Sequence, residues 1–109
     1  MKKENLTKEY KDIIYKIGYY RNKNKLSARD TSLQLGFSDS FINRIERYTV
    51  ELKVSTLLKF MDLVGITPFE FFYPNPENFA KDKEVFDLIM SLTPENKETI
   101  IDLANKLKK

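Results

Sequence analysis

The chain of 109 residues contains no cysteine, no histidine and no tryptophan. Without cysteine it has neither a disulfide framework nor a thiolate nucleophile, and without histidine it lacks the commonest general base and the commonest zinc ligand. Its three glycines stand far apart in the sequence, which excludes a glycine-rich phosphate-binding loop. Only carboxylates remain as metal ligands, and no pair of acids falls in a predicted cleft. We therefore expect no enzymatic activity, no metal site and no cofactor.

Long apolar runs are also absent. No stretch approaches the roughly 18 apolar residues of a membrane-spanning helix. The first ten residues, MKKENLTKEY, lack the apolar centre of a secretion signal. We therefore expect a cytoplasmic protein without a membrane partner.

The charged residues are unevenly distributed. Residues 1–54 contain 12 Lys/Arg and 7 Asp/Glu, whereas residues 55–109 contain 7 and 9. A basic first half favours a polyanionic partner, with nucleic acid as the first candidate. A lysine-rich solvated surface explains the same counts equally well, so charge alone does not decide between them.

Apolar residues recur at helical spacing almost throughout, which predicts an all-α fold. A first helix is expected over about residues 5–23. A second should begin at the N-cap Ser27 and end before Gly36, and Ser38 should cap a third helix that runs to about Glu46. Ser55 is the expected cap of a fourth helix, which Gly65 closes.

The segment Thr67-Pro68-Phe69-Glu70 is a strong start signal for a short fifth helix. The clearest break follows at Tyr73-Pro74-Asn75-Pro76, where each proline disfavours helix in the residue before it. We place a domain boundary there, between residues 1–74 and 75–109. Two more amphipathic helices are expected after it, the second beginning at Thr93-Pro94-Glu95.

Two short helices joined by a turn containing Gly36, at residues 27–46, are the geometry of a helix-turn-helix. The apolar residues expected to fix this pair on the core are Leu33, Leu35, Phe37, Ile42 and Ile45. Such packing would leave the start of the second helix of the pair exposed, and a helix fits the major groove of DNA.

The run LSARDTSLQLGFSDSFINRIER, followed by STLLKFMDLVGITPFEFF, resembles the lambda-repressor-like family, also called the Cro/C1 or Xre helix-turn-helix family. The resemblance covers about residues 13–73. It implies a five-helix DNA-binding domain that acts as a dimer on a partly palindromic operator in double-stranded DNA, here followed by a two-helix C-terminal extension.

The resemblance also implies roles for individual residues. Those matching base-contacting positions are Asp39, Ser40, Asn43 and Arg44. Those expected at phosphates are Ser27, Ser38, Arg47, Lys23 and Lys25, although a solvated surface role is an equal alternative for each lysine. Arg21 and Glu46 match a structural ion pair between the first and third helices.

The sequence departs from the family pattern at several places, and Asp39 is one of them, because a carboxylate is unusual at a base-facing position. Ala28 stands where the family often has a glutamine that touches phosphate. Tyr48 stands where a glycine usually follows the recognition helix, so either Tyr48 ends the helix without glycine's freedom or the helix runs longer.

Among the tyrosines, Tyr10 and Tyr20 are expected in the core, whereas Tyr15 and Tyr19 fit either a half-exposed helix face or an interface.

The apolar stripes of residues 77–109 must be buried somewhere. They either fold back on the first domain or pair with a second copy, and the need for two half-sites favours a homodimer. The candidate interface residues are Leu88, Ile89, Leu92, Ile100, Leu103 and Leu107.

The leading hypothesis is a sequence-specific transcriptional repressor. The alternative is an antitoxin-like protein-interaction module on the same fold, with weakened DNA binding and a second protein as its partner.

Overall fold

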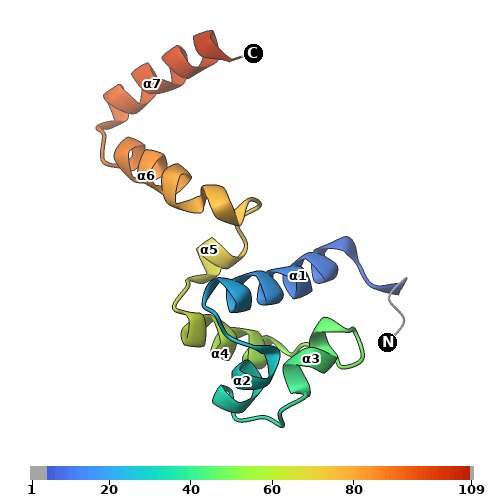
Figure 1. Cartoon of the computed structure of the whole chain (residues 1–109). Helices are drawn as coiled ribbons and strands as arrows, with labels where there is room; N and C mark the ends of the chain where they lie inside the picture. The colour runs from blue at the N-terminus through green and yellow to red at the C-terminus, as the bar shows by residue number, and fades with distance from the viewer. Residues whose placement is uncertain (1–4, 109) are drawn as a thin grey trace. The chain divides into compact units, whose positions relative to one another are not determined.

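The computed structural model describes residues 5–108, and these contain seven α-helices and no strand (Figure 1). The all-α class predicted from the sequence is confirmed. The described residues divide into two compact units, one ending at Phe72 and the other beginning at Tyr73. The helices of the first unit are α1 (Lys8–Lys23), α2 (Ala28–Gln34), α3 (Phe41–Glu46), α4 (Val54–Val64) and α5 (Pro68–Phe71).

The core of the first unit is formed by one apolar face from each of α1, α3, α4 and α5. Its buried members are Ile14, Ile17, Tyr20, Ile42, Ile45, Leu57, Phe60, Met61 and Phe71. Helix α2 contributes two buried polar residues instead, Thr31 and Ser32, whose hydroxyls donate to backbone carbonyls one turn earlier in the chain. Burial of these hydroxyls is therefore compensated by hydrogen bonds.

Several helix ends lie where the sequence predicts them. Ser27 Oγ accepts a hydrogen bond from the backbone N–H of Asp30, and Thr67 Oγ1 accepts one from Glu70. These bonds satisfy backbone donors that the first helical turn leaves unpaired. Gly65 ends α4 in the left-handed conformation, with φ 72°.

Three predicted helix starts are wrong. Helix α1 begins at Lys8, three residues later than expected, with Thr7 as its N-cap. The N-cap of α3 is Ser40 rather than Ser38, because residues 38–40 form a turn in which the Ser38 carbonyl accepts from the N–H of Phe41. Helix α4 begins at Val54 with Lys53 at its N-cap, not at Ser55.

Burial differs from the sequence prediction at Leu33 of α2, which is 49% exposed and does not help to fix the helix pair on the core. Of the three phenylalanines in and directly after α5, only Phe71 is buried, and Phe69 and Phe72 are half exposed. A four-residue helix presents one narrow face to the core, which has room for one of the three rings.

Tyr10 and Tyr20 have the core positions expected from the sequence. Tyr20 is 1% exposed, and its ring lies 5.9 Å from that of Phe71, centroid to centroid. Tyr10 is half buried, and its hydroxyl accepts a hydrogen bond of 2.8 Å from the backbone N–H of Leu52. This bond attaches the segment between α3 and α4 to the first helix.

Tyr48 follows α3 where the family usually has a glycine. Helix α3 stops at Glu46, and Tyr48 takes a positive φ of 62°. Of the two possibilities left open by the sequence, the tyrosine therefore adopts the left-handed conformation and the helix does not run longer. Lys25, between α1 and α2, also has a positive φ, 58°.

The second unit contains a short 3₁₀ turn, η2 (Pro76–Asn78), followed by α6 (Phe79–Met90) and α7 (Pro94–Leu107). Thr93 caps α7 as predicted, with its Oγ1 accepting from the N–H of Asn96. The hydroxyl of Tyr73 donates to the carboxylate of Asp82, which joins the start of the unit to α6. Many apolar side chains of both helices remain exposed, including Leu88 and Leu107.

Candidate nucleic-acid interface

A surface groove of about 420 Å³ runs between the start of α2 and the start of α3. Its lining residues are Ala28, Arg29, Asp39, Ser40, Asn43, Arg44 and Arg47. The four residues predicted to contact bases all line this groove, together with Arg47 from the phosphate set. The groove therefore gathers most of the predicted site on the exposed side of the helix pair.

A buried serine sets the distance between the two helices. Ser32 Oγ, on α2, accepts a hydrogen bond of 2.9 Å from the backbone N–H of Ile42 on α3 and donates one of 2.8 Å to the carbonyl of Ala28. Ser32 and Ile42 are both fully buried. The N–H of Ile42 belongs to the first turn of α3, so Ser32 acts as a cap supplied by the neighbouring helix.

The turn between the helices depends on Gly36. Its φ of 86° lies in the left-handed region, which glycine adopts without the penalty that a Cβ atom imposes. The backbone N–H of Phe37 then donates to the carbonyl of Ser32, and the rings of Phe37 and Phe41 stack 4.2 Å apart, centroid to centroid. This turn directs Asp39, Asn43 and Arg44 toward solvent, and all three are exposed.

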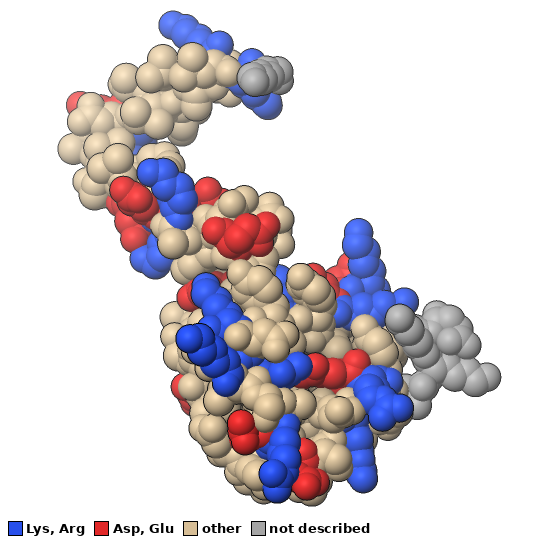
Figure 2. Space-filling model, viewed as in Figure 1, with Lys and Arg blue, Asp and Glu red and all other residues tan. Residues whose placement is uncertain are grey.

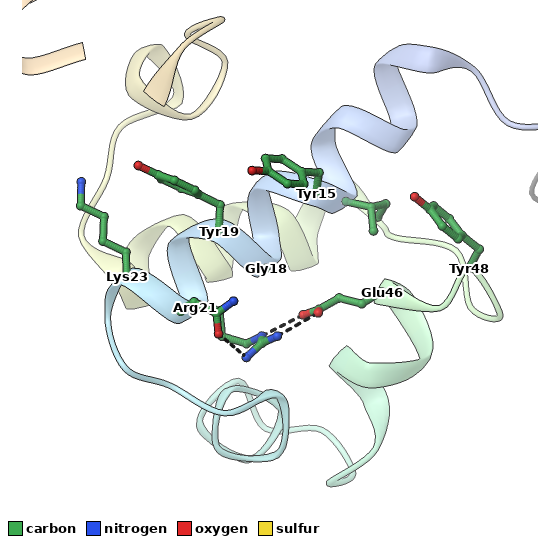
Figure 3. A pocket seen from close by; sticks show the side chains of 9 residues that line it. Tyr15, Gly18, Tyr19, Arg21, Lys23, Glu46 and Tyr48 are labelled. Carbon is green, nitrogen blue, oxygen red and sulfur yellow. Dashed lines mark hydrogen bonds and ion pairs between the residues drawn. The ribbon is translucent and has the colours of Figure 1, made fainter. Parts of the chain in front are cut away.

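Arg21 and Glu46 brace α3 against α1 (Figure 3). Arg21 Nε and Nη2 each lie 2.9 Å from one carboxylate oxygen of Glu46, and Nη1 donates to the carbonyl of Leu26. The two side chains are 15% and 22% exposed. A two-pronged pair at this depth fixes orientation as well as position, so the C-terminal end of α3 is held rigidly.

Sequence reasoning missed Arg29. Its Nε lies 3.6 Å from Asp39 Oδ2 across the groove, and both side chains are more than half exposed. The only signal for Arg29 in the sequence is a basic residue one position after Ala28, within the first turn of the helix that precedes α3.

The remaining predicted phosphate residues lie outside the groove. Ser27 is exposed at the N-cap of α2, where its side chain holds the first turn. Ser38 is exposed but is not at a helix N-terminus, which removes the reason for placing it at a phosphate. Lys23 and Lys25 are exposed at and after the end of α1 and do not line the groove.

The charges on the groove are mixed, with a basic excess. Arg29, Arg44 and Arg47 face a single carboxylate, that of Asp39. Figure 2 shows the same mixture on the viewed face of the first unit, where acidic side chains lie among the lysines and arginines. The groove therefore combines three positive charges with one negative charge, which differs from a uniform basic patch.

No helix among residues 5–108 is long and apolar enough to cross a membrane. Within the same residues, no cluster of three or more acidic side chains has the arrangement of a metal site.

Comparison with known proteins identifies the family. Residues 17–71, just over half of the chain, match the family described as helix-turn-helix, of the Cro/C1 type. No curated protein and no solved structure matches the chain. The matched segment extends from the middle of α1 to the end of α5 and includes the whole groove between α2 and α3. The chain belongs to the Cro/C1-type helix-turn-helix family of DNA-binding regulators.

Proposed function

We propose that this protein is a sequence-specific transcriptional repressor that reads a partly palindromic operator with α3. The observation that carries the proposal is the groove in which Asp39, Ser40, Asn43 and Arg44 meet beside the capped start of α2. Occupation of an operator near a promoter would exclude the polymerase. The domain formed by α1–α5 would supply the DNA contact and the extension formed by α6 and α7 the contact between copies.

Each residue of the groove is proposed to have a role that its chemistry allows. Arg44 donates two hydrogen bonds to the O6 and N7 atoms of guanine, and Asn43 contacts an adenine or a phosphate. Asp39 accepts from the N4 amino group of cytosine, while Ser40 contacts a neighbouring base edge. Arg47 and Ser27 contact phosphates, which sets the register of the protein on the duplex. Lys23 and Lys25 lie at the end of α1 and are proposed as further phosphate contacts.

The proposed dimer uses the exposed apolar faces of α6 and α7. In the single chain Leu88, Leu103 and Leu107 are more than half exposed, whereas Ile89, Leu92 and Ile100 are already partly buried. Burying leucine and isoleucine side chains contributes roughly 1.5–3 kcal/mol each when burial is complete. A second copy that covers the same six residues would place two recognition helices on two half-sites.

The DNA-binding proposal is tested by selection. The purified full chain is mixed with fragmented genomic DNA from its source at a low and a high salt concentration, and the bound fragments are sequenced. The proposal predicts a few discrete sites that share an inverted repeat and weaken at high salt, because phosphate contacts release counterions. Enrichment of no site, or recovery of fragments in proportion to their abundance, contradicts it.

The dimer proposal has its own test. Leu88→Asp is compared with Lys81→Gln, an exposed position on the same helix whose substitution changes the net charge by the same amount. We expect Leu88→Asp to sediment as a monomer with unchanged helicity and Lys81→Gln to remain a dimer. A wild-type monomer, or a Leu88→Asp dimer, contradicts the proposed interface.

The second candidate function is an antitoxin-like protein-interaction module. The feature that favours it is the carboxylate of Asp39 in the groove, together with the absence of a polar side chain at Ala28 and the acidic Glu51 after α3. The slope of the logarithm of the DNA-binding constant against the logarithm of the salt concentration becomes more negative by about 0.9 for each phosphate contact. A slope close to zero would favour this module, whereas a slope of several units would favour the repressor.

A further inference from the structure

A second groove, larger than the first, lies along α1 (Figure 3). Its volume is about 690 Å³, within the range of roughly 300–1,000 Å³ that is typical of small-molecule sites. The lining residues are Ile14, Tyr15, Gly18, Tyr19, Arg21, Asn22, Lys23, Glu46 and Tyr48. None of them lines the groove between α2 and α3, so the two sites are separate.

Three of the nine residues that line this groove are tyrosines. Tyr15 and Tyr19, one turn apart on α1, project from the same side of the helix, and Tyr48 stands across from them (Figure 3). Tyr15 is 66% exposed, an unusual amount for a ring that large. The ring of Tyr19 is held edge-on against Tyr20, with the centroids 5.0 Å apart. A planar ligand can stack on such rings or contact their edges, and ordering a tyrosine side chain costs little entropy.

Gly18 forms the open floor of the groove. A glycine inside a helix is less favourable than alanine by about 1 kcal/mol. Packing does not require it here, because the nearest heavy atom to an added Cβ would be Glu46 Oε1 at 3.5 Å, an ordinary contact distance. The effect of the missing side chain is therefore to leave space between the tyrosines.

The charges of the groove favour an anion. Arg21 and Glu46 neutralise each other in a closed pair in the groove wall. Lys23, at the end of α1, is exposed, and its Nζ lies 5.9 Å from the ring centroid of Tyr20. No carboxylate of the described residues lies within ion-pair distance of Lys23. The lining therefore has one uncompensated positive charge, that of Lys23, at the end of the groove formed by the last turn of α1.

We propose that this groove is a binding site for a small planar aromatic molecule that carries one anionic group. The ring lies over Gly18 between Tyr15 and Tyr48, and the anionic group faces Lys23. Because Glu46 is the last residue of α3, the ligand contacts the same helix that carries Asn43 and Arg44. The binding site itself does not depend on the proposed DNA-binding function.

Three probes separate the features of the proposed ligand. Naphthoate is planar and anionic, naphthalenemethanol is planar and neutral, and decalin carboxylate is anionic but not planar. Backbone amide NMR shifts of the full chain are followed during titration with each probe. We expect saturable shifts with naphthoate, confined to the residues that line the groove and their neighbours, and markedly weaker binding of the other two. The absence of shifts, shifts located elsewhere, or equal binding of all three probes would overturn the proposal.

Two variants test the residues. Gly18→Ala adds one methyl group to the floor, so it should weaken naphthoate binding while raising the melting temperature, which excludes unfolding as the cause. Lys23→Gln should weaken binding by about two- to five-fold, as expected for an exposed charge pair, and Lys8→Gln, outside the groove, should not. Unchanged naphthoate affinity in Gly18→Ala, or equal effects of the two lysine substitutions, contradicts the assignment.

Discussion

Arg29, in the first turn of α2, and Asp39, in the turn before α3, form an ion pair across the groove with Nε and Oδ2 3.6 Å apart. Both side chains are largely exposed, so water screens their attraction and the pair adds little to the stability of the fold. We expect the ion pair to affect DNA binding instead. The carboxylate holds one of the three groove arginines and repels any phosphate that approaches it.

Neutralising Asp39 should therefore change DNA binding more than folding. We expect Asp39→Asn to bind unrelated DNA more tightly and to lose discrimination at one base pair by roughly 1–3 kcal/mol, the value of one base contact. Titrations against selected and scrambled duplexes measure both effects. Asp62→Asn on α4 is the control with the same charge change outside the groove. If Asp39→Asn keeps both affinities of the wild type, the carboxylate has no part in recognition.

The half-buried pair of Arg21 and Glu46 should behave differently. Glu46→Gln removes the charge that faces a guanidinium with little access to water, and we expect the free energy of unfolding to fall by about 1–3 kcal/mol. Urea denaturation measures the change, and Asp39→Asn, from the exposed pair, is the matched comparison. A loss for Glu46→Gln no larger than that of Asp39→Asn would show that the brace between α1 and α3 is energetically neutral.

Lys25 adopts a left-handed conformation that favours glycine. We expect Lys25→Gly to raise the free energy of unfolding by about 0.5–1 kcal/mol, since the strain at Cβ is relieved and part of the gain is offset by the greater freedom of glycine in the unfolded chain. Lys23→Gly, two residues earlier and helical, should lower it by about 1 kcal/mol. Thermal or urea unfolding of the two variants gives the signs. Destabilisation by both would contradict the backbone argument.

The hydrogen bond from Tyr73 to Asp82 should be visible in a titration. This bond, with smaller contributions from burial and from the charge of Asp82, raises the pKa of Tyr73 above its ordinary value. The protonated phenol is therefore favoured in the folded state. Its contribution to stability is present below the unfolded pKa, about 10, and is lost as the pH rises through the higher folded pKa.

Tyrosinate absorbance measures this titration. Subtracting the curve of Tyr73→Phe from that of the wild type isolates Tyr73 among the six tyrosines. Asp82→Asn should move the isolated curve to lower pH. An isolated curve that Asp82→Asn leaves in place would show that the bond does not form in solution.

Features that depend on neighbouring residues could be predicted from the sequence. Ser27, Thr67 and Thr93 each cap a helix as expected, because the side chain bonds to a backbone N–H only three residues away. The family resemblance added the pairing of Arg21 with Glu46, whose spacing in the sequence gives no local signal.

Features that depend on how the helices cross could not be predicted in this way. Both Ser38 and Ser40 are acceptable caps in the sequence, but neither side chain caps α3, and an N–H of its first turn bonds instead to the buried Ser32 of the neighbouring helix. Arg29 and Asp39 meet only because the turn at Gly36 brings the two helices together. Leu33 belongs to an apolar stripe that is wider than the face α2 buries, so periodicity alone overstates its burial.

The proposed contact of Arg44 with a base can be tested by one comparison of affinities. Wild type and Arg44→Ala are titrated against a selected operator duplex and a scrambled duplex of the same composition at fixed salt. We expect Arg44→Ala to lose about 1–3 kcal/mol of the preference for the operator, while its binding to the scrambled duplex falls much less. Equal affinity of the wild type for both duplexes, or an unchanged preference in Arg44→Ala, would contradict the claim that α3 reads sequence through Arg44.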